Sequence, residues 1–109
     1  MIICFYDNSE IKDEPIINID RVYCLEFDKF TNDSWDRLAE IYSLLPSQII
    51  KNHIGQPCWF GEEGKTDFFL WASVEPSGLQ IVGTLRSGDW NEWEGKFNKY
   101  IAVLPFFEC

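Results

Sequence analysis

The sequence predicts an α+β domain in which two helices pack on a mostly antiparallel sheet. Alternating apolar residues around a turn indicate a central hairpin at about residues 67–86. Apolar residues at helical spacing indicate two packed helices, at about residues 34–45 and 89–104. The length of 109 residues suits a single domain spanning residues 1–109, because a chain of this size can bury one core and not two.

Two strands are expected before the first helix. Residues 2–6 form a short apolar run rich in β-forming residues, and a second strand is expected from about residue 19 to residue 27. The polar, acidic segment 7–15 between them ends in Pro15 and is expected to be a loop.

The first helix is expected to end at Leu45, because Pro46 cannot continue it without cost. Three residues can cap its start: Asn32, Asp33 and Ser34. Four apolar residues at helical spacing form the stripe that should face the core: Trp35, Leu38, Tyr42 and Leu45. A further short helical turn is expected within residues 47–55.

The hairpin is the clearest signal in the chain. Residues 75–78 read Glu-Pro-Ser-Gly, and Pro at the second and Gly at the fourth turn position are typical of a type I turn. Both faces of the hairpin carry apolar residues, so we expect it to be covered on both sides. Residues 58–61 can add a short strand before it. The second helix should place Trp90 and Trp93 in the core.

The charge balance restricts the class of partner. Eighteen acidic residues against nine basic ones give a net charge of −9. Such a chain is a poor ligand for nucleic acid or an anionic membrane. The start of the sequence lacks the basic region of a signal peptide, and no apolar run approaches the roughly 20 residues that span a bilayer. We therefore expect a cytoplasmic protein.

No catalytic or cofactor motif is present, so we expect a protein that is not an enzyme. His53 and Cys58 are the only candidates for a base and a thiol nucleophile, but no signature for an orienting group accompanies them. The four cysteines include no C-x-x-C pair, which argues against a metal site. The pair Gly61 and Gly64 has no phosphate-binding context, so no cofactor is expected.

Two groups of acidic residues indicate a docking surface for a basic protein. The first lies on one stripe of the predicted first helix: Asp33, Asp36 and Glu40. The second follows Trp59 in the sequence: Glu62, Glu63 and Asp67. Trp59 lies outside any strong periodicity, beside this charged loop, and is predicted to be the aromatic anchor of the interface. The alternative is a solvated surface that promotes solubility.

With its acidic stripe at Asp33, Asp36 and Glu40, its patch at Glu62, Glu63 and Asp67, and its many aromatics without a catalytic motif, the chain resembles a known class. It is similar in overall profile to the small bacterial immunity proteins of contact-dependent inhibition and other polymorphic toxin systems. The resemblance implies an inhibitor that occludes the active or substrate-binding site of a basic toxin, for example a nuclease.

Two other classes of function stay open. The chain could be a subunit or adaptor of a larger assembly that self-associates through exposed aromatic residues. It could also be a small enzyme or ligand-binding module that uses His53 and Cys58.

Overall fold

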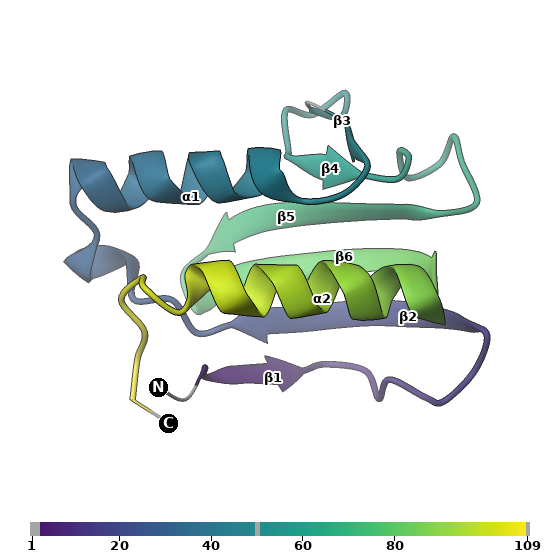
Figure 1. Cartoon of the computed structure of the whole chain (residues 1–109), viewed down its shortest axis with the longest axis horizontal. Coiled ribbons are helices and arrows are strands. Elements are labelled where there is room, and N and C mark those ends of the chain that lie inside the picture. Colours follow the sequence, from purple (N-terminus) through teal and green to yellow (C-terminus); the bar gives the residue numbers. More distant parts are fainter. Residues whose placement is uncertain (1–2, 50, 109) are drawn as a thin grey trace.

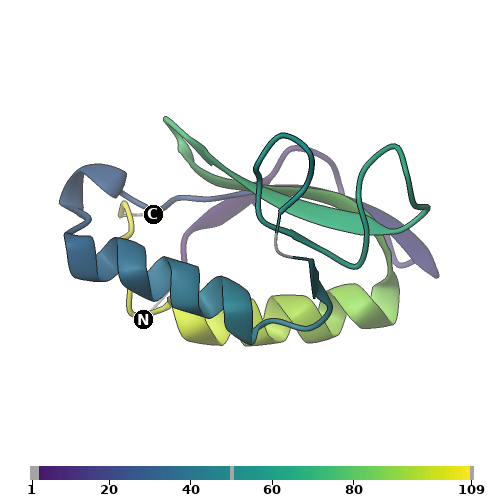
Figure 2. The ribbon, with the colours of Figure 1, turned by 90° about the horizontal axis from the view of Figure 1, so that it is seen from above.

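The fold has two layers, an antiparallel sheet and two helices that lie on the same face of it (Figure 1, Figure 2). The computed structural model describes residues 3–49 and 51–108, and within them the sheet has six strands in the order β1-β2-β6-β5-β4-β3. The strands are β1 (Phe5–Asp7), β2 (Ile16–Tyr23), β3 (Gln48–Ile49), β4 (Cys58–Trp59), β5 (Phe69–Glu75) and β6 (Gly78–Arg86). The helices are a 3-10 helix η1 (Phe27–Lys29), α1 (Asn32–Leu44) and α2 (Ser87–Ile101). The predicted α+β class is confirmed.

The predicted hairpin forms the centre of the sheet. β5 and β6 pair antiparallel from Phe69↔Thr84 to Glu75↔Gly78, which leaves a two-residue turn. Gly78 has a φ of 140°, and a Cβ there would lie 2.2 Å from the carbonyl oxygen of Tyr23. Only glycine fits both conditions, so this residue fixes the turn against β2.

Both predicted helices are present with shifted ends. The N-cap of α1 is Thr31 and not one of the three predicted residues. The Thr31 hydroxyl accepts from the Ser34 amide at 3.2 Å, and the Ser34 hydroxyl accepts from the Thr31 amide at 3.1 Å, which makes a capping box. α1 ends before Pro46 as predicted, whereas α2 begins at Ser87 and ends at Ile101, before the predicted residue 104.

Three expectations for local structure are wrong. The first strand is Phe5–Asp7 and not 2–6. The second strand is Ile16–Tyr23 and not 19–27, because the chain turns into η1 after it. Residues 48–49 form strand β3 rather than a helical turn, because they pair with β4. Positions 2 and 50, which belonged to two of the expected elements, lie outside the described residues.

The hairpin is covered by helices on one face only, contrary to the prediction (Figure 2). The covered face holds core residues such as Leu70, Ile81 and Leu85, all with no exposed area. On the other face, the strands β2 and β6 carry polar side chains that bond across the strands. Gln80 donates to Asp20 at 2.9 Å and Thr84 donates to Asn18 at 2.9 Å. These side chains can remain exposed to solvent, because their polar groups are hydrogen-bonded across the strands.

Candidate functional site

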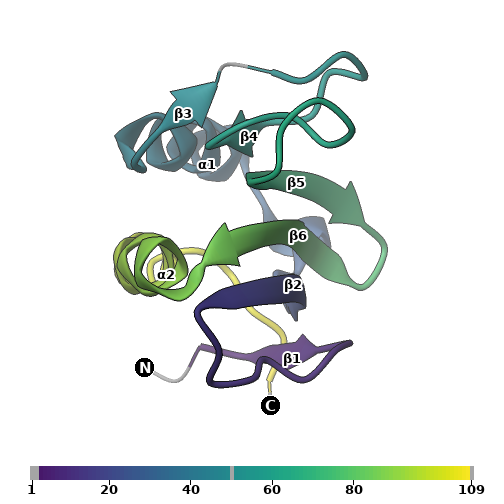
Figure 3. The same cartoon turned by 90° about the vertical axis from the view of Figure 1, so that its right-hand side faces the viewer.

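An apolar groove of about 200 Å³ lies between α1 and the edge of β5. Its lining comes from α1, from the segment before β4 and from β5, and includes Trp35, Ala39, Tyr42, Pro57, Ala72 and Val74. The groove can form there because the two helices cover different parts of the sheet. Figure 3 shows α1 on the β3–β4 side and α2 on the β6–β2 side. Because β4 has only two residues, most of β5 on the α1 side has no neighbouring strand.

The apolar stripe predicted on the first helix is divided between the core and this groove. Leu38 and Leu45 are buried, together with Ile41, which the stripe did not include. Trp35 is 39% exposed, and it lines the groove with Tyr42. The helix therefore turns part of its apolar side toward an edge of the sheet where no strand covers it.

Aromatic contacts hold Trp35 in place as a wall of the groove. Its ring stacks on Phe27 with centroids 5.2 Å apart and contacts Phe30 at 4.8 Å. Beyond it, Val74 is 52% exposed and Phe107 is 43% exposed. These two residues line a second hollow of about 310 Å³, which Val74 connects to the groove. The apolar groove thus borders a second hollow of mixed character, which Asp28 and Glu75 also line, and exposed apolar surface of this kind marks interaction sites.

The first acidic group lies on α1 next to the groove. Asp33, Asp36 and Glu40 are all exposed, and within the described part of the chain none of them forms an ion pair. Asp36 and Glu40 each follow a groove residue, Trp35 and Ala39, by one position. They therefore lie about 100° further around the helix, on its outer face. Unpaired carboxylates flank the apolar surface here.

The second acidic group is partly used within the protein. Glu62 accepts from the His53 amide at 2.6 Å and from its ring Nδ1 at 2.9 Å, and pairs with Lys65 at 3.0 Å. The hydrogen bonds from His53 and Lys65 lower the pKa of Glu62 to about 2. Glu62 thus joins the β3–β4 connection to the β4–β5 connection, and its role at a partner interface stays a prediction.

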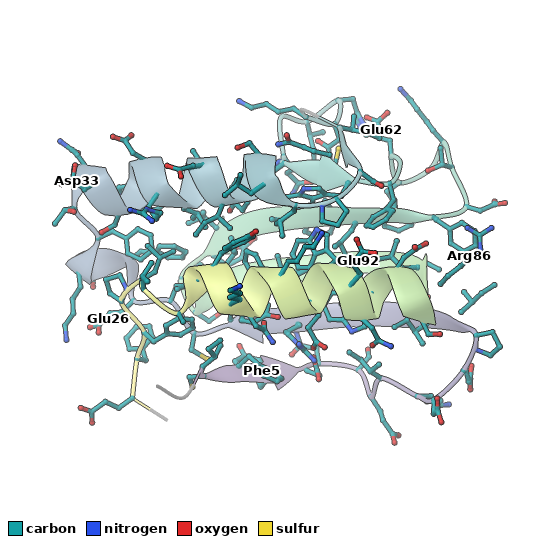
Figure 4. The ribbon with its side chains drawn as sticks, viewed as in Figure 1. Phe5, Glu26, Asp33, Glu62, Arg86 and Glu92 are labelled. Atoms are coloured by element: carbon teal, nitrogen blue, oxygen red, sulfur yellow. The ribbon has the colours of Figure 1, made fainter. Side chains whose placement is uncertain are left out.

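The other two residues of that group stay on the surface. Glu63 is exposed and accepts from the indole of Trp71 at 3.1 Å, and Asp67 is exposed. Figure 4 shows Glu62 beyond the C-terminal end of α1 and Asp33 at its N-terminal end. The two acidic groups therefore do not merge into one cluster.

Trp59 is not an exposed anchor, which corrects the prediction for it. The side chain has no exposed area and packs edge-to-face on Tyr42 at 5.5 Å and Trp93 at 5.1 Å. Its indole N–H donates to the Tyr42 carbonyl at 3.2 Å. That carbonyl lies in the last turn of α1, where its regular partner would be the amide of residue 46, and Pro46 has none. Trp59 therefore satisfies a carbonyl at the C-terminal end of α1 from within the core. Trp35, and not Trp59, is the exposed tryptophan beside the groove.

A buried arginine was missed by the sequence reasoning. Arg21 is 4% exposed and donates from Nε to Asp7 at 2.7 Å, with Glu94 as its second carboxylate. Its guanidinium lies 3.9 Å from the ring centroid of Phe5 (Figure 4 labels Phe5). Burial alone would lower the pKa of Arg21, but the hydrogen bond to Asp7 and its other partners raise it above the ordinary value. The signal in the sequence is a charged residue at a core-facing position of β2, between Ile19 and Tyr23.

His53 and Cys58 do not form the pair that a thiol nucleophile needs. The Cys58 thiol is buried and donates to the Ile49 carbonyl at 3.6 Å, while His53 bonds to Glu62. Burial, with the nearby charge of Glu62, raises the pKa of Cys58. A nucleophilic cysteine requires the opposite shift.

A comparison of the chain with protein-family models, curated proteins and solved structures finds no match. No helix in the described ranges is long and apolar enough to cross a membrane. In the same ranges, no three His, Cys, Asp or Glu side chains are placed to hold a metal ion.

Proposed function

We propose that this chain is an intracellular inhibitor that binds a basic protein and neutralises it by occlusion, as small acidic immunity proteins do to their toxins. The observation that carries the proposal is an apolar groove at an open sheet edge, beside a helix whose outer face bears exposed carboxylates. Desolvated apolar contacts supply most of the affinity of an interface, while complementary charge speeds encounter and selects the partner.

The proposed mechanism is competition for the partner's own cationic groups. A toxin that acts on nucleic acid presents Lys and Arg side chains to phosphate. Asp33, Asp36 and Glu40 would pair with such groups, and Trp35 would pack on the partner's apolar surface. Glu63 and Asp67 belong to a separate exposed region and would add to the field of the protein rather than to this contact.

The test is affinity capture at low salt with elution by a salt step and identification by mass spectrometry. The wild-type chain is compared with D36K/E40K and with E10K/E14K, which changes the net charge equally on the β1–β2 loop, at the opposite edge of the sheet. We expect a stoichiometric basic protein with the wild type and with E10K/E14K, and its loss with D36K/E40K. Equal capture by all three chains would exclude the α1 stripe from the interface.

A second function, as a subunit of a larger assembly, is favoured by the open face of the sheet. Trp71 and Val82 lie opposite each other on that face, and neither is fully buried. Light scattering at two protein concentrations, in low and high salt, separates the two functions. A dimer that survives high salt indicates apolar self-association, whereas a monomer under all conditions leaves the inhibitor as the better proposal.

A further inference from the structure

The edge of β5 that faces the groove lacks a neighbouring strand over its C-terminal half. Leu70 and Trp71 pair with β4, and the Ala72 amide donates to the Pro57 carbonyl at 3.0 Å. Pro57 has no N–H to return to the Ala72 carbonyl, so the pairing ends there.

The chain before Pro57 turns away from β5. Asn52 and Gln56 bond to each other through their backbones at 3.0 Å, and the Asn52 side chain accepts from the Gln56 amide at 3.0 Å. This closed loop cannot continue β4 alongside Ser73 and Val74. The gap is therefore a consequence of the local sequence rather than of chain length.

Val74 presents both of its backbone groups to this gap. Glu75 and Gly78 flank a two-residue turn and bond to each other, so the odd-numbered residues of β5 bond to β6 and the even-numbered ones point the other way. The Ala72 amide follows this alternation, because it bonds to Pro57 and not to β6. Within the described residues, no backbone group bonds to the amide or carbonyl of Val74 on the groove side.

We infer that the partner binds by adding an extended strand to the free edge of β5, with apolar side chains in the groove and basic side chains around it. This inference rests on the proposed function. Alternate side chains of such a strand would point toward α1, where Trp35 and Tyr42 form an apolar wall. The others would point to the open face, where Glu75 lies, and basic groups at its ends would reach Asp36.

Charge and shape select this occupant. A helix would leave the amide and carbonyl of Val74 without partners, whereas a strand supplies both. The chain carries a net charge of −9, and within the described residues Asp36 and Glu40 beside the groove form no ion pair. An extended segment that alternates apolar residues with Lys or Arg complements both features.

The experiment uses a synthetic probe, acetyl-Lys-Ile-Lys-Val-Lys-Ile-Lys-amide, added at up to millimolar concentration to the full-length chain labelled with ¹⁵N. Amide shifts and hydrogen exchange are followed by NMR. We expect exchange at the Val74 amide to be fast in the free protein and to slow at least about tenfold when the probe saturates it. The Ala72 amide, which is already bonded, serves as the internal control.

Two matched comparisons test the backbone pairing. Probes methylated on the amide nitrogens of one edge or of the other should differ in affinity by roughly tenfold, since a strand pairs through one edge only. On the protein side, Val74→Pro deletes the free N–H and no bond to β6, and should weaken binding by roughly tenfold. Val74→Thr keeps the N–H and the branched shape and should bind within about threefold of the wild type. Circular dichroism reports whether each variant folds, and the methylated probes give the answer on the wild type if Val74→Pro does not.

The outcomes separate the two proposals. Slowed exchange at Val74 together with the predicted edge dependence supports strand addition. Shifts at Asp36 and Glu40 with unchanged exchange at Val74 would overturn strand addition and leave docking of a basic partner standing. Absence of any shift at millimolar probe would overturn the strand inference, while capture of a basic protein by the intact chain would still support the proposed function.

Discussion

Replacing Trp59 by phenylalanine should destabilise the fold without weakening binding at the groove. The indole is fully buried, and its N–H donates to the Tyr42 carbonyl, which Pro46 leaves without its regular helical partner. Phenylalanine cannot donate, and an unsatisfied buried carbonyl costs about 1–3 kcal/mol. The smaller ring adds about 1 kcal/mol for lost packing against Tyr42 and Trp93. The free energy of unfolding should fall by about 2–4 kcal/mol.

The matched control is Trp35→Phe, in which the same change is made on a side chain that is 39% exposed. The free energy of unfolding should change by less than about 1 kcal/mol, because partly exposed positions lose little on truncation. Trp35→Ala should weaken binding of the basic probe peptide, since it removes the wall of the groove.

Urea unfolding followed by far-ultraviolet circular dichroism measures both effects, and it is preferred to fluorescence because the chain has five tryptophans. A loss of about 2–4 kcal/mol would lower the thermal midpoint by about 10 °C or more. Unfolding of Trp59→Phe within about 0.5 kcal/mol of the wild type, combined with weakened probe binding, would refute the reasoning. Trp59 would then be the anchor that the sequence suggested.

Three further predictions concern stability. Arg21→Ala should cost about 1–3 kcal/mol in urea unfolding, because it removes a buried side chain that packs on Phe5 and Trp90 and pairs with Asp7 and Glu94; a cost below about 0.5 kcal/mol would contradict this. Gly83→Ala should prevent folding or sharply lower the thermal midpoint of the protein, because the added Cβ would lie 2.1 Å from the Phe69 carbonyl oxygen. Gly95→Ala is the control: it has open space around it in α2 and should stabilise the protein by about 1 kcal/mol in the same melts. Glu62 has a pKa lowered from 4.5 to about 2, so its contribution is complete above pH 4.5 and is lost as the pH falls toward 2. Acid titrations of stability should therefore show a smaller loss over this range in Glu62→Gln, and identical titrations would show that the contacts of Glu62 add nothing.

Much of the fold could be predicted because its signals are local. Three such signals depend only on residues close in the sequence: the turn at residues 75–78, the alternation on either side of it, and the helix stop at Pro46. The expectations that were wrong depend on distant partners. Residues 48–49 are a strand because β4 lies beside them, and the open face of the hairpin stays uncovered because both helices lie on the other face.

In the candidate site, too, the features set by local sequence could be predicted and those set by tertiary contacts could not. The carboxylates of Asp33, Asp36 and Glu40 could be placed on one exposed face from helical periodicity alone. The partners of Glu62 could not be anticipated, since they depend on how residues 53 and 62 meet in space. Arg21 likewise gains its carboxylates only where β1 and α2 converge on β2.

The sequence by itself determined the class of fold, the hairpin at its centre, the two helices and the strongly acidic charge, because propensity, turn chemistry and composition are properties of short segments. Only the tertiary structure decided which tryptophan is buried and which is exposed. It also decided that α1 lies beside a strand edge that β4 does not fill. Burial and pairing depend on neighbours brought together from distant parts of the chain, so the groove between Trp35 and Val74 exists only once the sheet has formed.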